Sequence, residues 1–95
     1  MKTIGILVFD EVEELDFVGP LEVFGMAARF GADCETLVIA PQPEYVRCRH
    51  GLQVVPDCIL QEAPALDLLI VPSGRERTPE QIRRFWNLCA ARVAR

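Results

Sequence analysis

Residues 13–24 read Glu-Glu-Leu-Asp-Phe-Val-Gly-Pro-Leu-Glu-Val-Phe, and they follow an apolar run at residues 3–9. That run is rich in β-branched side chains and is typical of a strand covered on both faces of a parallel sheet. The quoted stretch then belongs to a helix that we expect from Val12 to Phe30, with Gly31 just beyond its C-cap. Asp16 is therefore an acidic residue at the carboxyl end of the first strand, where open α/β sheets bind ligands.

Pro20 lies inside this predicted helix. Proline has no N–H to donate to the carbonyl four residues earlier, which here belongs to Asp16. The sequence predicts either a kink at Gly19-Pro20 or a boundary between two short helices. In both cases the backbone around Asp16 is irregular.

Further strand-like segments follow in an order typical of an α/β fold. The expected elements are a strand at 34–40, a hairpin with arms at 45–49 and 52–55, a loop or single helical turn at 60–65, and a second buried strand at 66–71. The hairpin prediction depends on two β-prone runs joined by the two residues His50-Gly51. Crossovers between parallel strands are expected to be right-handed.

The last predicted helix has the clearest capping signal in the chain. Thr78 is the expected N-cap, Pro79 the first helical position, and Gln81 lies three residues after the cap. An apolar stripe follows at helical spacing, formed by Ile82, Phe85, Trp86, Cys89 and Val93. This helix should return the chain to another parallel strand, so we expect the fold to be incomplete at its carboxyl end.

Length and composition restrict the class of protein. The 95 residues, 51% of them hydrophobic, suit one domain with a real core. No apolar run approaches the roughly 18 residues that a membrane span needs, and no signal peptide pattern follows Met1, so the cytoplasm is the expected compartment. The cysteines show no metal-ligand spacing and the chain has one histidine, so we expect neither a metal nor another cofactor.

Charge is distributed unevenly along the chain. Residues 1–72 carry 12 acidic and 4 basic side chains, whereas residues 73–95 carry 2 acidic and 6 basic ones. The basic end could serve as an arm that binds nucleic acid. Its arginines lie among apolar residues, however, as on an amphipathic surface helix. This favours the surface helix, and we expect no direct nucleic-acid binding by this segment.

Four stretches resemble the ThiJ/PfpI family of the class I glutamine amidotransferase-like group: residues 3–9, 13–24, 50–57 and 66–74. The most similar subgroup contains the isonitrile hydratases and the amidotransferase-like sensor domains of AraC-type regulators. The resemblance extends over nearly the whole chain, and residues 13–24 are its most specific part. It implies a flavodoxin-like (Rossmann-like) three-layer sandwich with a mostly parallel sheet, a small-molecule substrate and a homodimer.

The resemblance also implies site residues. Asp16 matches an acidic residue that points at a nucleophilic cysteine, and Gly74 matches a glycine whose amide helps to hold the reacting oxygen. Ser73, at the same substrate-binding turn, replaces the first of two glycines usual in the family. No residue matches the cysteine itself, which the family carries on a sharp strand-to-helix turn. Cys89 lies on the apolar stripe of the last helix, so we expect it to fill the core.

The residues alone leave each position open. Asp16 is either an acidic residue favoured by the helix dipole or an acid–base group beside a reacting centre. Gly74 either permits a turn or exposes an amide to an oxyanion. His50 suits a turn better than a role as ligand or base. Glu13 and Glu14 suit a solvated helix face.

We therefore expect residues 1–95 to form the amino-terminal part of a ThiJ/PfpI-type domain. A complete relative would be a cysteine-dependent hydratase or hydrolase of small molecules, with Asp16 aiding proton transfer as water adds to an isonitrile-like carbon. Without the cysteine turn, this chain is expected to be inactive alone. The alternatives are a ligand-sensing domain of an AraC-type transcription regulator and a non-catalytic remnant that dimerises.

Overall fold

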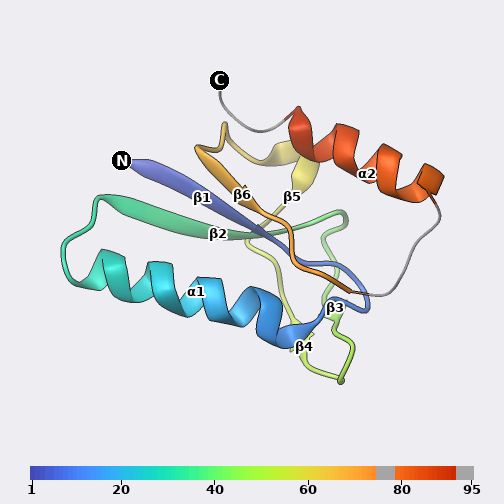
Figure 1. Cartoon of the computed structure of the whole chain (residues 1–95), viewed down its shortest axis with the longest axis horizontal. Coiled ribbons are helices and arrows are strands. Elements are labelled where there is room, and N and C mark those ends of the chain that lie inside the picture. The colour runs from blue at the N-terminus through green and yellow to red at the C-terminus, as the bar shows by residue number, and fades with distance from the viewer. Residues whose placement is uncertain (75–78, 92–95) are drawn as a thin grey trace.

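The computed structural model of the chain describes residues 1–74 and 79–91. Its elements, in chain order (Figure 1), are β1 (Lys2–Leu7), α1 (Glu14–Arg29), β2 (Cys34–Ala40), β3 (Val46–Arg47), β4 (Gln53–Val54), β5 (Cys58–Ile59), the 3-10 turn η1 (Leu60–Glu62), β6 (Leu68–Ile70) and α2 (Pro79–Ala90). None of the helices in these ranges is long and apolar enough to cross a membrane.

A four-stranded parallel sheet forms the centre of the molecule, with strand order β5-β2-β1-β6. Strands β1 and β2 stay in register from the pair Lys2 and Cys34 to the pair Leu7 and Ile39. Helices α1 and α2 lie on opposite sides of this sheet (Figure 1). The predicted α/β class with a mostly parallel sheet is confirmed.

The hydrophobic core lies along β1 and the two residues that follow it, Val8 and Phe9. Residues 4–9 are all buried, as expected of an apolar strand covered on both faces. Ile39 of β2 and Leu66, just before β6, are fully buried beside it, and Val12 and Phe17 close the core from the side of α1. The most buried part of the sheet therefore runs directly into the loop that starts α1.

Helix α1 ends as the sequence predicts. Gly31 adopts a φ of 109°, its N–H donates to the Ala28 carbonyl at 3.2 Å, and the Ala32 N–H donates to the Ala27 carbonyl at 3.0 Å. These two bonds form a Schellman motif, which needs a left-handed residue at the position of Gly31. The glycine allows that conformation without steric cost.

Pro20 lies within a helix that continues from Glu14 to Arg29, so the predicted boundary between two short helices is wrong. The physical reason is tertiary packing. Phe17 is buried in the core cluster and Leu21 packs against it, one on each side of the proline in sequence. These contacts hold both halves of the helix on the sheet although the hydrogen bond to the Asp16 carbonyl is missing. The kink itself stays a prediction.

The remaining predictions are confirmed with changes in extent. The hairpin forms with Val46 opposite Val54, and the helical turn at 60–65 is η1. Strand β6 is shorter than predicted and partly exposed, because in the described part of the sheet it pairs with β1 alone. Strand β5 has two residues, too few for a pattern in the sequence. The predicted cap Thr78 and the side chains of Ile82, Phe85, Cys89 and Val93 lie outside the described residues.

Candidate functional site

The loop after β6 lies against the segment between β1 and α1. The Glu13 N–H donates to the Ser73 carbonyl at 3.0 Å, and Val12 and Gly74 form an isolated antiparallel bridge. This pairing brings residues from distant parts of the sequence to the carboxyl ends of β1 and β6. Asp16, Ser73 and Gly74, the residues predicted for the site, all lie at this edge of the sheet.

Asp16 is held by Ser73. Its carboxylate oxygen Oδ2 accepts a hydrogen bond from the Ser73 hydroxyl and another from the Ser73 backbone N–H, the latter at 3.3 Å. Hydrogen bonds to an ionised carboxylate are stronger than those between neutral groups. Both residues are exposed. The carboxylate therefore has a fixed direction at the sheet edge while solvent, or a ligand, has access to it.

Gly74 comes too close to the first loop to carry a side chain. A Cβ at this position would lie 2.7 Å from Cε1 of Phe9 and 2.9 Å from the Glu11 carbonyl oxygen. The second contact is with backbone, which cannot move aside as a flexible side chain can. A glycine is therefore required for the two loops to meet.

Glu14 ties the β3–β4 hairpin to the start of α1. Its carboxylate oxygens lie 2.9 and 3.1 Å from the His50 N–H, and the Leu52 N–H donates to it at 3.4 Å. Burial raises the pKa of Glu14. The backbone N–H groups of Glu14 itself, His50 and Leu52, together with the charge of His50, lower this pKa by more, so that it lies below its ordinary value. The contact therefore stabilises the fold fully above the ordinary value of 4.5 and is lost as the pH falls below it.

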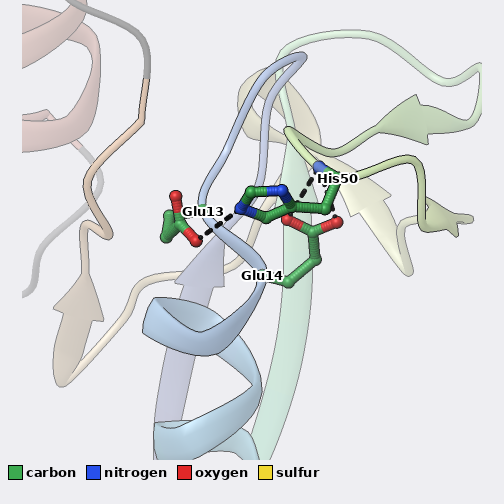
Figure 2. A group of neighbouring side chains, drawn as sticks. All are labelled: Glu13, Glu14 and His50. Atoms are coloured by element: carbon green, nitrogen blue, oxygen red, sulfur yellow. Dashed lines mark hydrogen bonds and ion pairs between the residues drawn. The ribbon is translucent and has the colours of Figure 1, made fainter.

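Glu13 lies on the other side of His50. Its Oε1 is 3.1 Å from Nε2 of His50 and its Oε2 is 3.9 Å from Nε of Arg49. Figure 2 shows the imidazole reaching across toward Glu13, with Glu14 beside it. Glu13 and Glu14 are half-buried with defined partners, so the expectation of a solvated face is wrong. No pattern in the sequence indicates these contacts, because the partners lie more than 35 positions away.

The same three side chains are close enough to share a cation. Ligand atoms of Glu13, Glu14 and His50 all lie within 4.8 Å of one another. The carboxylates already have partners, however, because Arg49 lies beside Glu13 and backbone N–H groups bind Glu14. The arrangement accounts for how the hairpin is anchored, and His50 takes the turn position that the sequence predicts.

The described cysteines do not suit a nucleophile. Cys48 is 2% exposed, and burial together with the charges of Glu14 and Asp10 raises the pKa of its thiol. Burial and two neighbouring carboxylates likewise raise the pKa of Cys58. Cys34 pairs with Lys2 at the amino end of the sheet, opposite the edge that holds the candidate site. Since the thiolate is the reactive form, the raised pKa values disfavour Cys48 and Cys58 as nucleophiles, and its position at the far end of the sheet disfavours Cys34.

A sequence model of the DJ-1/PfpI family matches residues 2–89. The chain belongs to the DJ-1/PfpI family. It is 41% identical over 69 residues to an uncharacterized protein in the cpoL 5′ region of Streptomyces lividans, covering 73% of this chain and 49% of that protein. It is 31% identical over 71 residues to isonitrile hydratase of Pseudomonas putida, covering 75% of this chain and 29% of the hydratase.

Two solved structures share this fold. A ThiJ/PfpI family protein from Pseudomonas syringae matches with a TM-score of 0.76 and 24% identity, over 97% of this chain and 39% of that one. An AraC family transcriptional regulator from Pseudomonas putida matches with a TM-score of 0.71 and 24% identity, over 96% and 59%. The predicted flavodoxin-like sandwich is thus confirmed as a partial fold. The chain spans about half or less of the curated relatives that it matches.

We predict that Gly74→Ala lowers the free energy of unfolding by about 1–3 kcal/mol, because the new methyl group overlaps the Glu11 backbone and the Phe9 ring. Gly25→Ala is the matched control. A Cβ at Gly25 meets nothing within 4 Å, and alanine in a helix is favoured over glycine by about 1 kcal/mol. Urea unfolding followed by circular dichroism compares the two variants. Equal loss of stability in both would contradict the close approach at Gly74.

Proposed function

We propose that this chain contributes the acidic side of a DJ-1/PfpI catalytic site. In this proposal the complete protein is a cysteine-dependent hydratase or hydrolase of small molecules. The observation that carries it is the Asp16 carboxylate, held by Ser73 at the carboxyl ends of β1 and β6 yet open to solvent. Ligands of open α/β sheets bind at such an edge. The similarity to isonitrile hydratase supports the choice of reaction.

Proton transfer is the proposed role of Asp16. Hydration of an isonitrile places the oxygen of water on the terminal carbon, one hydrogen on that carbon and one on the nitrogen. These transfers need a group at the reacting centre that gives and takes protons, and a carboxyl group serves for both. In the proposed reaction a cysteine thiolate outside the described residues adds to the carbon, which takes up a proton. Water then adds to the same carbon and displaces the thiolate, which is thereby regenerated. Asp16 would face that thiol.

Ser73 and Gly74 complete the proposed site. The Ser73 hydroxyl and amide fix the direction of the Asp16 carboxylate, so that less reorganisation is needed when charge develops. The Gly74 amide is the proposed donor to the reacting oxygen, in the manner of an oxyanion hole. The close approach of Gly74 to Glu11 and Phe9 fixes the place of this residue, which directly follows Ser73, the partner of Asp16.

The 95-residue chain by itself is proposed to be inactive, because no thiol of Cys34, Cys48 or Cys58 is both activated and beside Asp16. All three are free cysteines. Free thiols persist in a reducing compartment, which supports the cytoplasm as the proposed location. No direct nucleic-acid binding by this segment is proposed.

We predict no turnover when the purified 95-residue protein is incubated with a small alkyl isonitrile, with the formamide product followed by NMR. Asp16→Asn is the diagnostic variant and Asp33→Asn the matched control, since Asp33 pairs with the amino terminus. Turnover that Asp16→Asn abolishes and Asp33→Asn retains would contradict inactivity. Protein from the native source, by contrast, should hydrate the isonitrile and lose this activity after alkylation by iodoacetamide. An absence of turnover by the native protein would contradict the hydratase proposal.

A homodimer is the second part of the proposal, and the outer face of α1 is its interface. This face consists of Leu15, Val18, Val23, Met26 and Phe30, all exposed. Leu15 and Phe30, at the two ends of the helix, are 75% and 80% exposed. Helical spacing places Leu15, Val23 and Met26 on the side opposite Phe17 and Leu21, which pack into the core. Val18 lies at the border of this side, and Phe30 is the C-cap residue. Apolar surface of this extent on a soluble domain marks an interaction site.

We predict that the wild-type chain elutes as a dimer in size-exclusion chromatography with light scattering. Val23→Glu places a charge on the outer face of α1 and should give monomers, because a buried unpaired carboxylate is costly. Trp86→Glu is the control, since Trp86 is an exposed apolar side chain on α2, across the sheet. A wild-type monomer, or equal effects of the two substitutions, would contradict this interface. A dimer without turnover in native protein would favour the non-catalytic remnant.

A ligand-sensing domain of a transcription regulator is the second candidate function. It is supported by the structural likeness to the AraC family regulator. Sensor and enzyme share the fold, so the likeness alone favours neither. DNA binding by protein from the native source, together with an absence of turnover, would favour the sensor.

A further inference from the structure

A second concave site lies where the loop after β1 meets the segment that leads into β3. It is an open cavity of about 410 Å³ lined by Asp10, Glu11, Glu44, Tyr45 and Arg47. Sites for small molecules typically enclose about 300–1,000 Å³. The lining contains none of the residues proposed for catalysis, so an inference about this cavity stands independently of the proposed function.

Backbone contacts attach the two walls of the cavity to each other. The Arg47 N–H donates to Oδ1 of Asp10 at 3.1 Å, and the Glu11 N–H donates to the Arg47 carbonyl at 2.9 Å. Alternation along β3 buries Val46 and leaves its neighbours Tyr45 and Arg47 exposed on the cavity side. Glu11 has a φ of 73°, in the left-handed region. Two hydrogen bonds therefore hold the wall formed by Asp10 and Glu11 against Arg47.

The lining favours positive charge. It contains three carboxylates and one guanidinium, a balance of −2. None of the three carboxylates forms an ion pair with a residue in the ranges 1–74 and 79–91. The Arg47 guanidinium lies near Gly51, with Nη2 3.7 Å from the place a Cβ would take there. The carboxylates of Glu11 and Glu44 and the Oδ2 atom of Asp10 are thus available to a cation from solution, whereas Oδ1 of Asp10 accepts the Arg47 N–H.

Tyr45 gives the cavity a second feature. Its side chain is 54% exposed, although an aromatic ring on a soluble domain gains by burial. An aromatic ring beside carboxylates binds organic cations, because the negative face of the ring attracts an ammonium or guanidinium group. A hydrated metal ion would not gain from the ring in this way. A site that combines carboxylates with an aromatic ring therefore binds organic cations more tightly than metal ions.

We propose that this cavity binds a small organic cation that carries an ammonium or guanidinium group on a short apolar stem. The charged group lies among the carboxylates of Asp10, Glu11 and Glu44, and the stem packs on the Tyr45 ring. The Arg47 guanidinium lies on the side of the cavity near Gly51 and repels the charged group of the ligand there. A free small molecule fits the volume of the cavity, and it is the ligand that we assign.

Titration with agmatine, which carries both a guanidinium and an ammonium group, tests the proposal. Tyr45 is the only tyrosine in the chain, so its ring signals in an NMR spectrum are unambiguous. At low ionic strength we expect saturable shifts of these signals and of the Glu11 and Glu44 amides. The affinity should be in the millimolar range, and replacing both acids by Glu11→Gln and Glu44→Gln should weaken it about fivefold or more, the scale expected for exposed charge pairs.

The control variant replaces two exposed acids outside the cavity, Glu62→Gln and Glu80→Gln, and should bind agmatine like the wild type. Magnesium chloride is the control ligand. Equal shifts of the Tyr45 signals by magnesium, or equal weakening by both double variants, would show general counterion attraction and overturn the proposal. Tighter binding of a blocked arginine peptide than of agmatine would overturn the assignment to a small molecule.

Discussion

The hydrogen bonds from Ser73 to the Asp16 carboxylate connect the loop after β6 to the first turn of α1. The Glu13 N–H bond to the Ser73 carbonyl and the close approach of Gly74 reinforce this connection. Because of it, an acidic side chain at the start of a helix lies at the carboxyl edge of a parallel sheet in a fixed direction. The candidate site depends on this connection more than on any single residue.

The segment 10–16 holds three other parts of the chain at once. Asp10 and Glu11 bind the backbone of Arg47, Glu13 and Glu14 bind the hairpin turn at His50, and Asp16 binds Ser73. Five of its seven residues are acidic. Carboxylates accept hydrogen bonds from backbone N–H groups that strands this short leave unpaired. The acidic residues of this segment, which the sequence alone would assign to a solvated surface, therefore hold together the loops at the edge of the sheet.

Local patterns in the sequence predict the parts of the fold that depend on them. The continuous apolar run predicts β1 as a doubly buried strand, and Gly31 predicts the end of α1. Tertiary packing decides the rest: Phe17 and Leu21 keep α1 whole across Pro20, and β5 exists only because β2 offers it a parallel edge. For the site, the resemblance to a family points to Asp16, Ser73 and Gly74. The bond between Asp16 and Ser73, 57 positions apart, has no periodic signal and needed the structure.

A double-mutant cycle measures this contact most directly. Asp16→Asn, Ser73→Ala and the double variant are compared with the wild type by urea unfolding at neutral pH. If Ser73 holds the Asp16 carboxylate, the losses in unfolding free energy of the two single variants add up to more than the loss in the double variant. The difference, the coupling energy, should be about 0.5–1 kcal/mol for an exposed charge-assisted hydrogen bond. Losses that add within about 0.3 kcal/mol would contradict the account, because residues without contact behave independently.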